Sequence, residues 1–123
     1  MTIIEAINNT DAIKPNTFEQ TEKIKWLSIL DGKIKREIID THEGADAVVF
    51  NEYNAATPLD TVLLVPAPYD EVYLRWLEAM IDNANNEYAK YNNSRIMFND
   101  AYSEYWRYYN RNHLPLSGKR KYF

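Results

Sequence analysis

Two long stretches of helical periodicity, separated by very few residues, constrain the fold of this chain most. Apolar side chains recur at three- and four-residue steps over residues 69–91 and again over residues 93–113. The Asn92-Asn93-Ser94 segment offers a break and an N-cap for the second stretch. Two long helices joined so closely must lie roughly antiparallel, so the sequence predicts a long α-hairpin.

The N-terminal third predicts two further helices. Thr2 and Glu5 have the spacing of a capping box, and Pro15 must end the helix that they begin. A second helix is expected over residues 17–41, where isoleucines and leucines fall on one face. Gly32 lies inside this helix, which predicts either that the helix bends or that another backbone comes close, with close packing favoured.

Between residues 42 and 68 the helical signal lapses. Gly44 and three prolines interrupt two short runs with β-propensity, residues 47–53 and 61–65. The sequence therefore predicts either a short β-hairpin or a projecting loop between the second and third helices.

The fold class expected from these patterns is mainly α: a small helical bundle built on the long antiparallel α-hairpin. Its 123 residues suit a single domain over 1–123, ending in a basic tail at 116–123. Cysteine is absent, which excludes disulfides and thiol chemistry, and three glycines cannot supply a P-loop. The apolar runs are too short for a membrane span and no leader pattern is present, so we expect a soluble, unprocessed chain with no membrane partner.

Charge is distributed unevenly along the chain. The net charge is −4, but residues 105–123 contain five basic and no acidic residues and so carry +5. The preceding residues 1–104 hold nine basic and eighteen acidic residues and so carry −9. This polarity favours an anionic partner for the C-terminal end, either phosphates or an acidic protein surface, with a solvated tail as the alternative.

Patterns typical of an active site are lacking. His42 and His113 are the only histidines, and both lie near expected helix ends, where capping accounts for them. Most acidic residues are expected on outward helix faces, and carboxylates spaced four apart indicate a solvated face more often than a metal site. We expect no catalytic residue, no metal site and no cofactor. The carboxylate pairs in question are Glu78 with Asp82 and Asp100 with Glu104.

Aromatic residues are abundant, with ten Tyr, three Trp and four Phe. Tyr102, Tyr105, Trp106 and Tyr109 fall on one face at core spacing, whereas Tyr108 lies off it. Core and interface packing is the favoured interpretation, and stacking on the bases of a nucleic acid is the alternative. The candidate contact residues for a partner or DNA are Arg107, Tyr108, Arg111, Lys119, Arg120, Lys121, Tyr122 and Phe123.

Several segments together resemble one family, the small head-tail connector (adaptor, or DNA-packaging) proteins of tailed phages and prophages of Gram-positive bacteria. The resemblance covers nearly the whole chain, although the basic residues 119–121 lie outside the pattern. The segments that carry it are Pro15-Asn16, 23–28, 41–44, 66–71 with Tyr73, 91–94, Phe98-Asn99 and 108–115.

The resemblance implies a mostly helical structural subunit rather than an enzyme. Such a protein is made in the bacterial host cytoplasm and docks as a ring on the portal after DNA packaging. It then lies at the head-tail junction of the virion. The implied partners are the portal protein, tail or stopper proteins, further copies of the chain, and DNA that passes through the channel without sequence-specific binding. A nucleic-acid-binding module that uses the C-terminal helix and tail is the alternative function.

Overall fold

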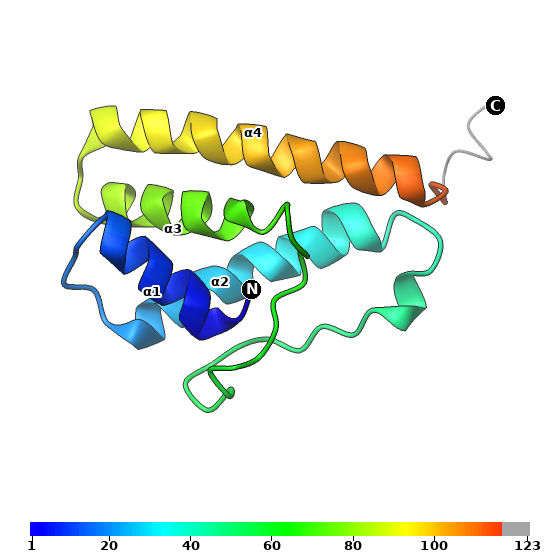
Figure 1. The fold of residues 1–123 in the computed structure, drawn as a ribbon, viewed down its shortest axis with the longest axis horizontal. Coiled ribbons are helices and arrows are strands. Elements are labelled where there is room, and N and C mark those ends of the chain that lie inside the picture. Colours follow the sequence, from blue (N-terminus) through cyan, green and yellow to red (C-terminus); the bar gives the residue numbers. More distant parts are fainter. Residues whose placement is uncertain (117–123) are drawn as a thin grey trace.

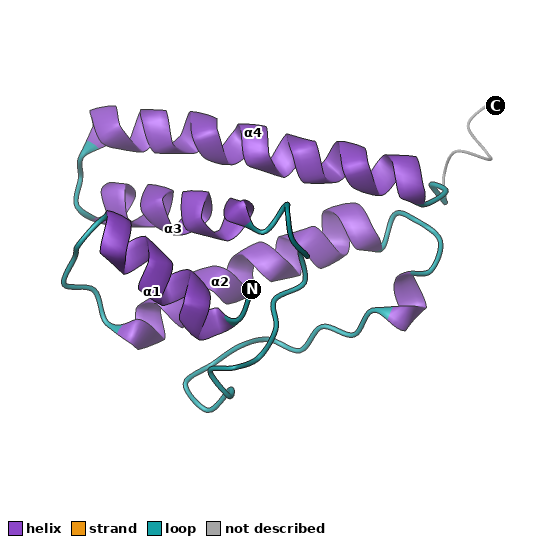
Figure 2. Cartoon of the chain, in the orientation of Figure 1, coloured by secondary structure: helices purple, strands orange, loops and turns teal. Residues whose placement is uncertain are grey.

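The computed structural model describes residues 1–116 and is mainly helical, which confirms the predicted class (Figures 1 and 2). Residues 117–123 lie outside the described part. The described residues contain no β-sheet, only isolated bridges between Thr2 and Val62 and between His42 and Pro115. The helices are α1 (Ile3–Ile13), α2 (Gln20–Ile34), α3 (Glu71–Ala84) and α4 (Tyr88–Asn112), with a π-helical turn η1 (Lys35–Ile39) and a short 3-10 turn η2 (Ala45–Ala47).

The start of α1 follows directly from local sequence. The Thr2 hydroxyl accepts a hydrogen bond from the Glu5 amide at 3.2 Å, and the Thr2 amide donates to the Glu5 carboxylate at 2.9 Å. These contacts form the predicted capping box and lower the pKa of Glu5. The helix ends at Ile13, two residues before Pro15, because proline cannot continue it.

The second helix is shorter than predicted and changes character near its end. It begins at Gln20 and passes into the π-helical turn η1 at Lys35, with its apolar stripe buried. The close neighbour of Gly32 is the ring of Phe50, 3.6 Å from where a Cβ would lie. The close packing favoured at Gly32 is therefore present, but a side chain from the following loop supplies it and not another backbone.

The break between α3 and α4 lies at residues 85–87, so the prediction of a break at 92–94 is wrong. Asn86 adopts a left-handed conformation with φ of 58°, which asparagine tolerates better than most residues. Ser94 lies inside α4, where its hydroxyl donates to Asp82 at 2.6 Å and so ties α4 to α3. The two helices lie side by side and run in opposite directions (Figure 1).

The segment between η2 and α3 contains no strand within the described residues, so the predicted short β-hairpin is wrong. Residues 61–63 pair with the N-terminus instead of with residues 47–53: the Ile3 amide donates to Thr61 O, and the Leu63 amide donates to Met1 O, both at 3.0 Å. The N-terminus therefore supplies the backbone partners that a second strand of a hairpin would have supplied.

Asp31 of α2 forms a polar centre in the core. Its carboxylate is fully buried and accepts hydrogen bonds from the hydroxyls of Tyr53 and Tyr73, each at 2.6 Å, and from the Leu64 amide at 3.1 Å. The Tyr73 hydroxyl in turn accepts from the Val65 amide at 2.7 Å. Asp31 of α2 thus holds Tyr53 and Leu64 of the loop, and Tyr73 of α3, at one point in the core.

Burial raises the pKa of Asp31 even though the three hydrogen bonds that it accepts lower it. The folded state therefore holds a proton on Asp31 more readily than the unfolded state does. The stability that this proton binding contributes is present below the ordinary pKa of 3.8 and is lost as pH rises toward the raised folded value.

We predict that the free energy of unfolding of the Asp31→Asn variant has a different pH dependence from that of the native protein, because asparagine does not titrate. The stability advantage of the native protein over Asp31→Asn should be largest at pH 3.8 and below, and it should shrink as pH rises above that value. Urea denaturation of both proteins at several pH values measures this difference. Parallel pH profiles would contradict it.

Two further acidic residues lie inside rather than on the outward face that the sequence predicts. Asp82 is buried between Ser94 and Lys14, whose Nζ lies 2.7 Å from the carboxylate. Glu78 is buried and lies 3.2 Å from Arg75. The four-residue spacing of these acids thus marks the packed side of α3, where each carboxylate has a local partner.

Candidate interaction surface

The segments at 41–44 and 108–115, both of which carry the family resemblance, lie against each other at the C-terminal end of α4. The Glu43 amide donates to Leu114 O at 2.8 Å, and the Leu116 amide donates to Thr41 O at 2.9 Å. The two chain segments therefore run antiparallel for a few residues.

The histidines lie against helix carbonyls at this end of the molecule. The buried His42 ring has Nδ1 2.6 Å from Ile38 O, has Nε2 beside the side chain of Asn110, and meets the Tyr109 ring edge-on at 5.0 Å. His113 has Nδ1 3.3 Å from Tyr109 O. These contacts are those of side chains that cap helix ends.

The aromatic face of α4 is only partly buried. Tyr105 and Tyr109 lie in the core, but Trp106 is 47% exposed, so of the two predicted roles, core and interface, the core role does not apply to it. Tyr108, expected off the core face, is half-buried, with its ring 4.6 Å from that of Tyr69. Tyr69 thus covers part of Tyr108, whereas Trp106 lies beside Glu37 and Ile38 of η1.

Two of the candidate contact residues are exposed on α4. Arg107 and Arg111 lie one helical turn apart, and together with Tyr69 and Glu104 they line a shallow hollow. Among residues 1–116 neither arginine has an ion-pair partner. The other basic and aromatic candidates lie outside the described residues: Lys119, Arg120, Lys121, Tyr122 and Phe123.

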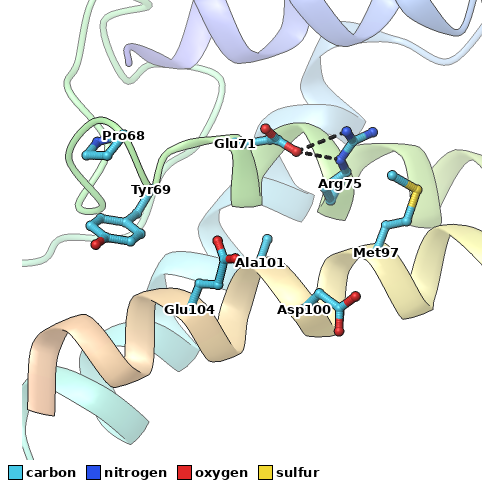
Figure 3. Close-up of a pocket in the computed structure, with 8 residues that line it drawn as sticks. All are labelled: Pro68, Tyr69, Glu71, Arg75, Met97, Asp100, Ala101 and Glu104. Carbon is cyan, nitrogen blue, oxygen red and sulfur yellow. Dashed lines mark hydrogen bonds and ion pairs between the residues drawn. The ribbon is translucent and has the colours of Figure 1, made fainter.

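A groove runs between the start of α3 and the middle of α4 (Figure 3). Arg75 on its α3 side donates to Glu71 at 2.9 Å. Asp100 and Glu104 are exposed along its α4 side, in agreement with the solvated face that their spacing predicts. Carboxylates therefore outnumber basic groups in this groove, and its lining is completed by Pro68, Tyr69, Met97 and Ala101.

A second hollow, which we call the Trp106 hollow, lies between α4 and η1. It is lined by Glu37, Ile38, Tyr102, Ser103 and Trp106. The Tyr102 hydroxyl donates to the Glu37 carboxylate at 2.6 Å, and burial together with this hydrogen bond raises the pKa of Tyr102.

Within residues 1–116 no group of three or more metal-binding side chains is close enough to hold an ion. No helix of that part is long and apolar enough to cross a membrane. Asp31, the carboxyl group whose pKa burial raises, lies in the core and lines none of the hollows described above. Its chemistry is therefore that of a structural contact.

Sequence reasoning missed the burial of Asp31 and the exposure of Trp106. A signal for Asp31 was present, because the residue falls on the apolar stripe of α2, four residues after Leu27 and three before Ile34. No comparable local signal marks Trp106, whose neighbours across the hollow, Glu37 and Ile38, come from a distant part of the chain.

Comparison with known proteins finds no matching family model, no matching curated protein and no matching solved structure.

Proposed function

We propose that this protein is a head-tail connector of a tailed phage or prophage. It is a structural subunit that docks as a ring on the portal after DNA packaging and joins head to tail. The supporting observation is that segments carrying the family resemblance pack on one another. Residues 41–44 form hydrogen bonds with residues 108–115, and the ring of Tyr69, in segment 66–71, lies tilted against that of Tyr108 at 4.6 Å. The resemblance thus falls on residues that share tertiary contacts, and not only on scattered surface positions.

The surface suits assembly in a ring. Subunits that close a ring head-to-tail need two different patches that complement each other. The groove of Figure 3 is rich in carboxylates, whereas Arg107, Arg111 and the tail residues 119–121 are basic. The groove and the Arg107–Arg111 hollow adjoin, because Tyr69 and Glu104 line both. The basic tail residues 119–121 are therefore the patch that pairs with a neighbour's groove in this proposal.

The test is to locate the protein in purified phage particles. Immunogold electron microscopy with an antibody against the chain should label the head-tail junction. A phage preparation made without the gene should contain DNA-filled heads to which no tail is attached. A normal, tailed particle without the protein would overturn the proposal.

Direct binding of nucleic acid is the second candidate, favoured by the exposure of Arg107 and Arg111 on one side of α4. Binding through these and the three basic tail residues should weaken steeply between 50 and 200 mM salt, on the order of a hundredfold or more. A fluorescently labelled single-stranded oligonucleotide measures this, with Arg107→Ala/Arg111→Ala as the matched variant. Tight, salt-sensitive binding that the double variant loses would favour this function over the connector.

A further inference from the structure

The Trp106 hollow combines a half-exposed tryptophan with a buried apolar neighbour. Trp106 is 47% exposed, while Ile38 beside it is 1% exposed. A large aromatic side chain left half in water at the edge of such a hollow is typical of a binding hot spot. The occupant must therefore bring apolar surface of its own.

The chain leads toward this hollow. In the antiparallel contact of residues 41–43 with 114–116, each step forward from Leu114 to Leu116 runs back from Glu43 to Thr41. A chain that continued beyond Leu116 in the same direction would approach Ile38 and Glu37.

The length of chain that follows is sufficient. Thr41 lies four residues after Glu37, a helical rise of about 6 Å. Seven residues follow Leu116, and they can extend about 23 Å. The end of the chain can therefore reach the Trp106 hollow of its own molecule without any change in the described residues.

The composition of this end matches the hollow. Residues 119–123 read Lys-Arg-Lys-Tyr-Phe, a basic run followed by two aromatic residues. The rings of Trp106 and Tyr102 line the hollow, and so does the exposed residue Glu37. Glu43, which is also exposed, lies in the antiparallel contact with Leu114 from which the chain continues. Tyr122 and Phe123 supply the apolar surface, and the basic run supplies the complementary charge.

We propose that residues 119–123 dock into the Trp106 hollow of the same molecule, with the aromatic end against Trp106 and the basic run toward Glu37 and Glu43. The isolated subunit then covers its own binding surface. A partner that takes the C-terminal end exposes Trp106, and a partner that occupies the hollow frees the C-terminal end. In the proposed ring the same basic residues 119–121 pair with a neighbouring subunit, so this contact belongs to the isolated subunit.

The test uses the full-length chain and the indole N–H signals of its three tryptophans in a ¹⁵N–¹H NMR spectrum. The double variant Tyr122→Ala/Phe123→Ala should shift the Trp106 indole signal and the amide signals of Glu37 and Ser103. The Trp76 indole is the internal control, because its Nε1 donates to Trp26 O at 2.8 Å and should not respond.

A reciprocal pair of variants separates docking from a general effect of removing an aromatic ring. Trp106→Ala should shift the amide signals of residues 119–123. Tyr88→Ala removes another exposed aromatic of α4, 65% exposed near the opposite end of the helix, and should leave those signals in place.

Two results would overturn the proposal. One is a Trp106 indole signal that the tail double variant does not move. The other is a shift that fades as the protein is diluted, because the contact would then join two copies. Both measurements are made on the isolated protein, so their outcome does not depend on where the protein is found in phage particles.

Discussion

Replacing Asp31 by alanine is expected to destabilise the protein by at least about 3 kcal/mol, because three buried donors lose their acceptor together. The donors are the hydroxyls of Tyr53 and Tyr73 and the Leu64 amide, all within 3.1 Å of the carboxylate. Each buried donor left without a partner costs about 1 to 3 kcal/mol. Water entering the space would offset part of this loss.

Urea denaturation followed by far-ultraviolet circular dichroism measures the effect. Asp100→Ala is the matched control, because Asp100 is an exposed aspartate on α4 and its loss should change the free energy of unfolding by less than about 0.5 kcal/mol. Tyr53→Phe removes a single donor and should cost about 1 kcal/mol. Equal stabilities of the two aspartate variants would show that Asp31 does not hold the core together.

Replacing Leu77 by alanine is expected to cost about 2 to 5 kcal/mol. Leu77 is fully buried on α3, within the core cluster that α2 and α4 complete. The substitution removes three carbon atoms from a site whose neighbours are held by helix packing, so a cavity remains.

Thermal melting tests this prediction, with Ile96→Ala as the matched control. Ile96 is an aliphatic residue of α4 that is 59% exposed, so its truncation leaves no cavity and should barely change the melting temperature. If both variants melted like the native protein, α3 would not contribute Leu77 to a packed core.

Local signals in the sequence determined the start of α1, its end before Pro15 and the buried stripe of α2. The Thr2–Glu5 capping box forms as its spacing predicts. These features depend on residues within one or two turns of one another, so the chain specifies them before any long-range contact forms. The mainly helical class follows from the same kind of signal.

Local signals could not choose between competing break points. Asn85-Asn86 and Asn92-Asn93-Ser94 are similar candidates by composition. The chain breaks at the first because Ser94, from within α4, bonds to the buried Asp82 of α3. That contact exists only once the two helices have packed.

The tertiary structure alone decided which aromatic and acidic residues form the candidate interaction surface. Tyr108 and Trp106 are two residues apart on α4, yet Tyr69 covers the first and the second faces the Trp106 hollow. Asp31 became a buried acceptor because the loop brings Tyr53 and Leu64 to it from far along the chain. Helical periodicity assigns a residue to a face, but the edge of the neighbouring element decides whether that face is covered.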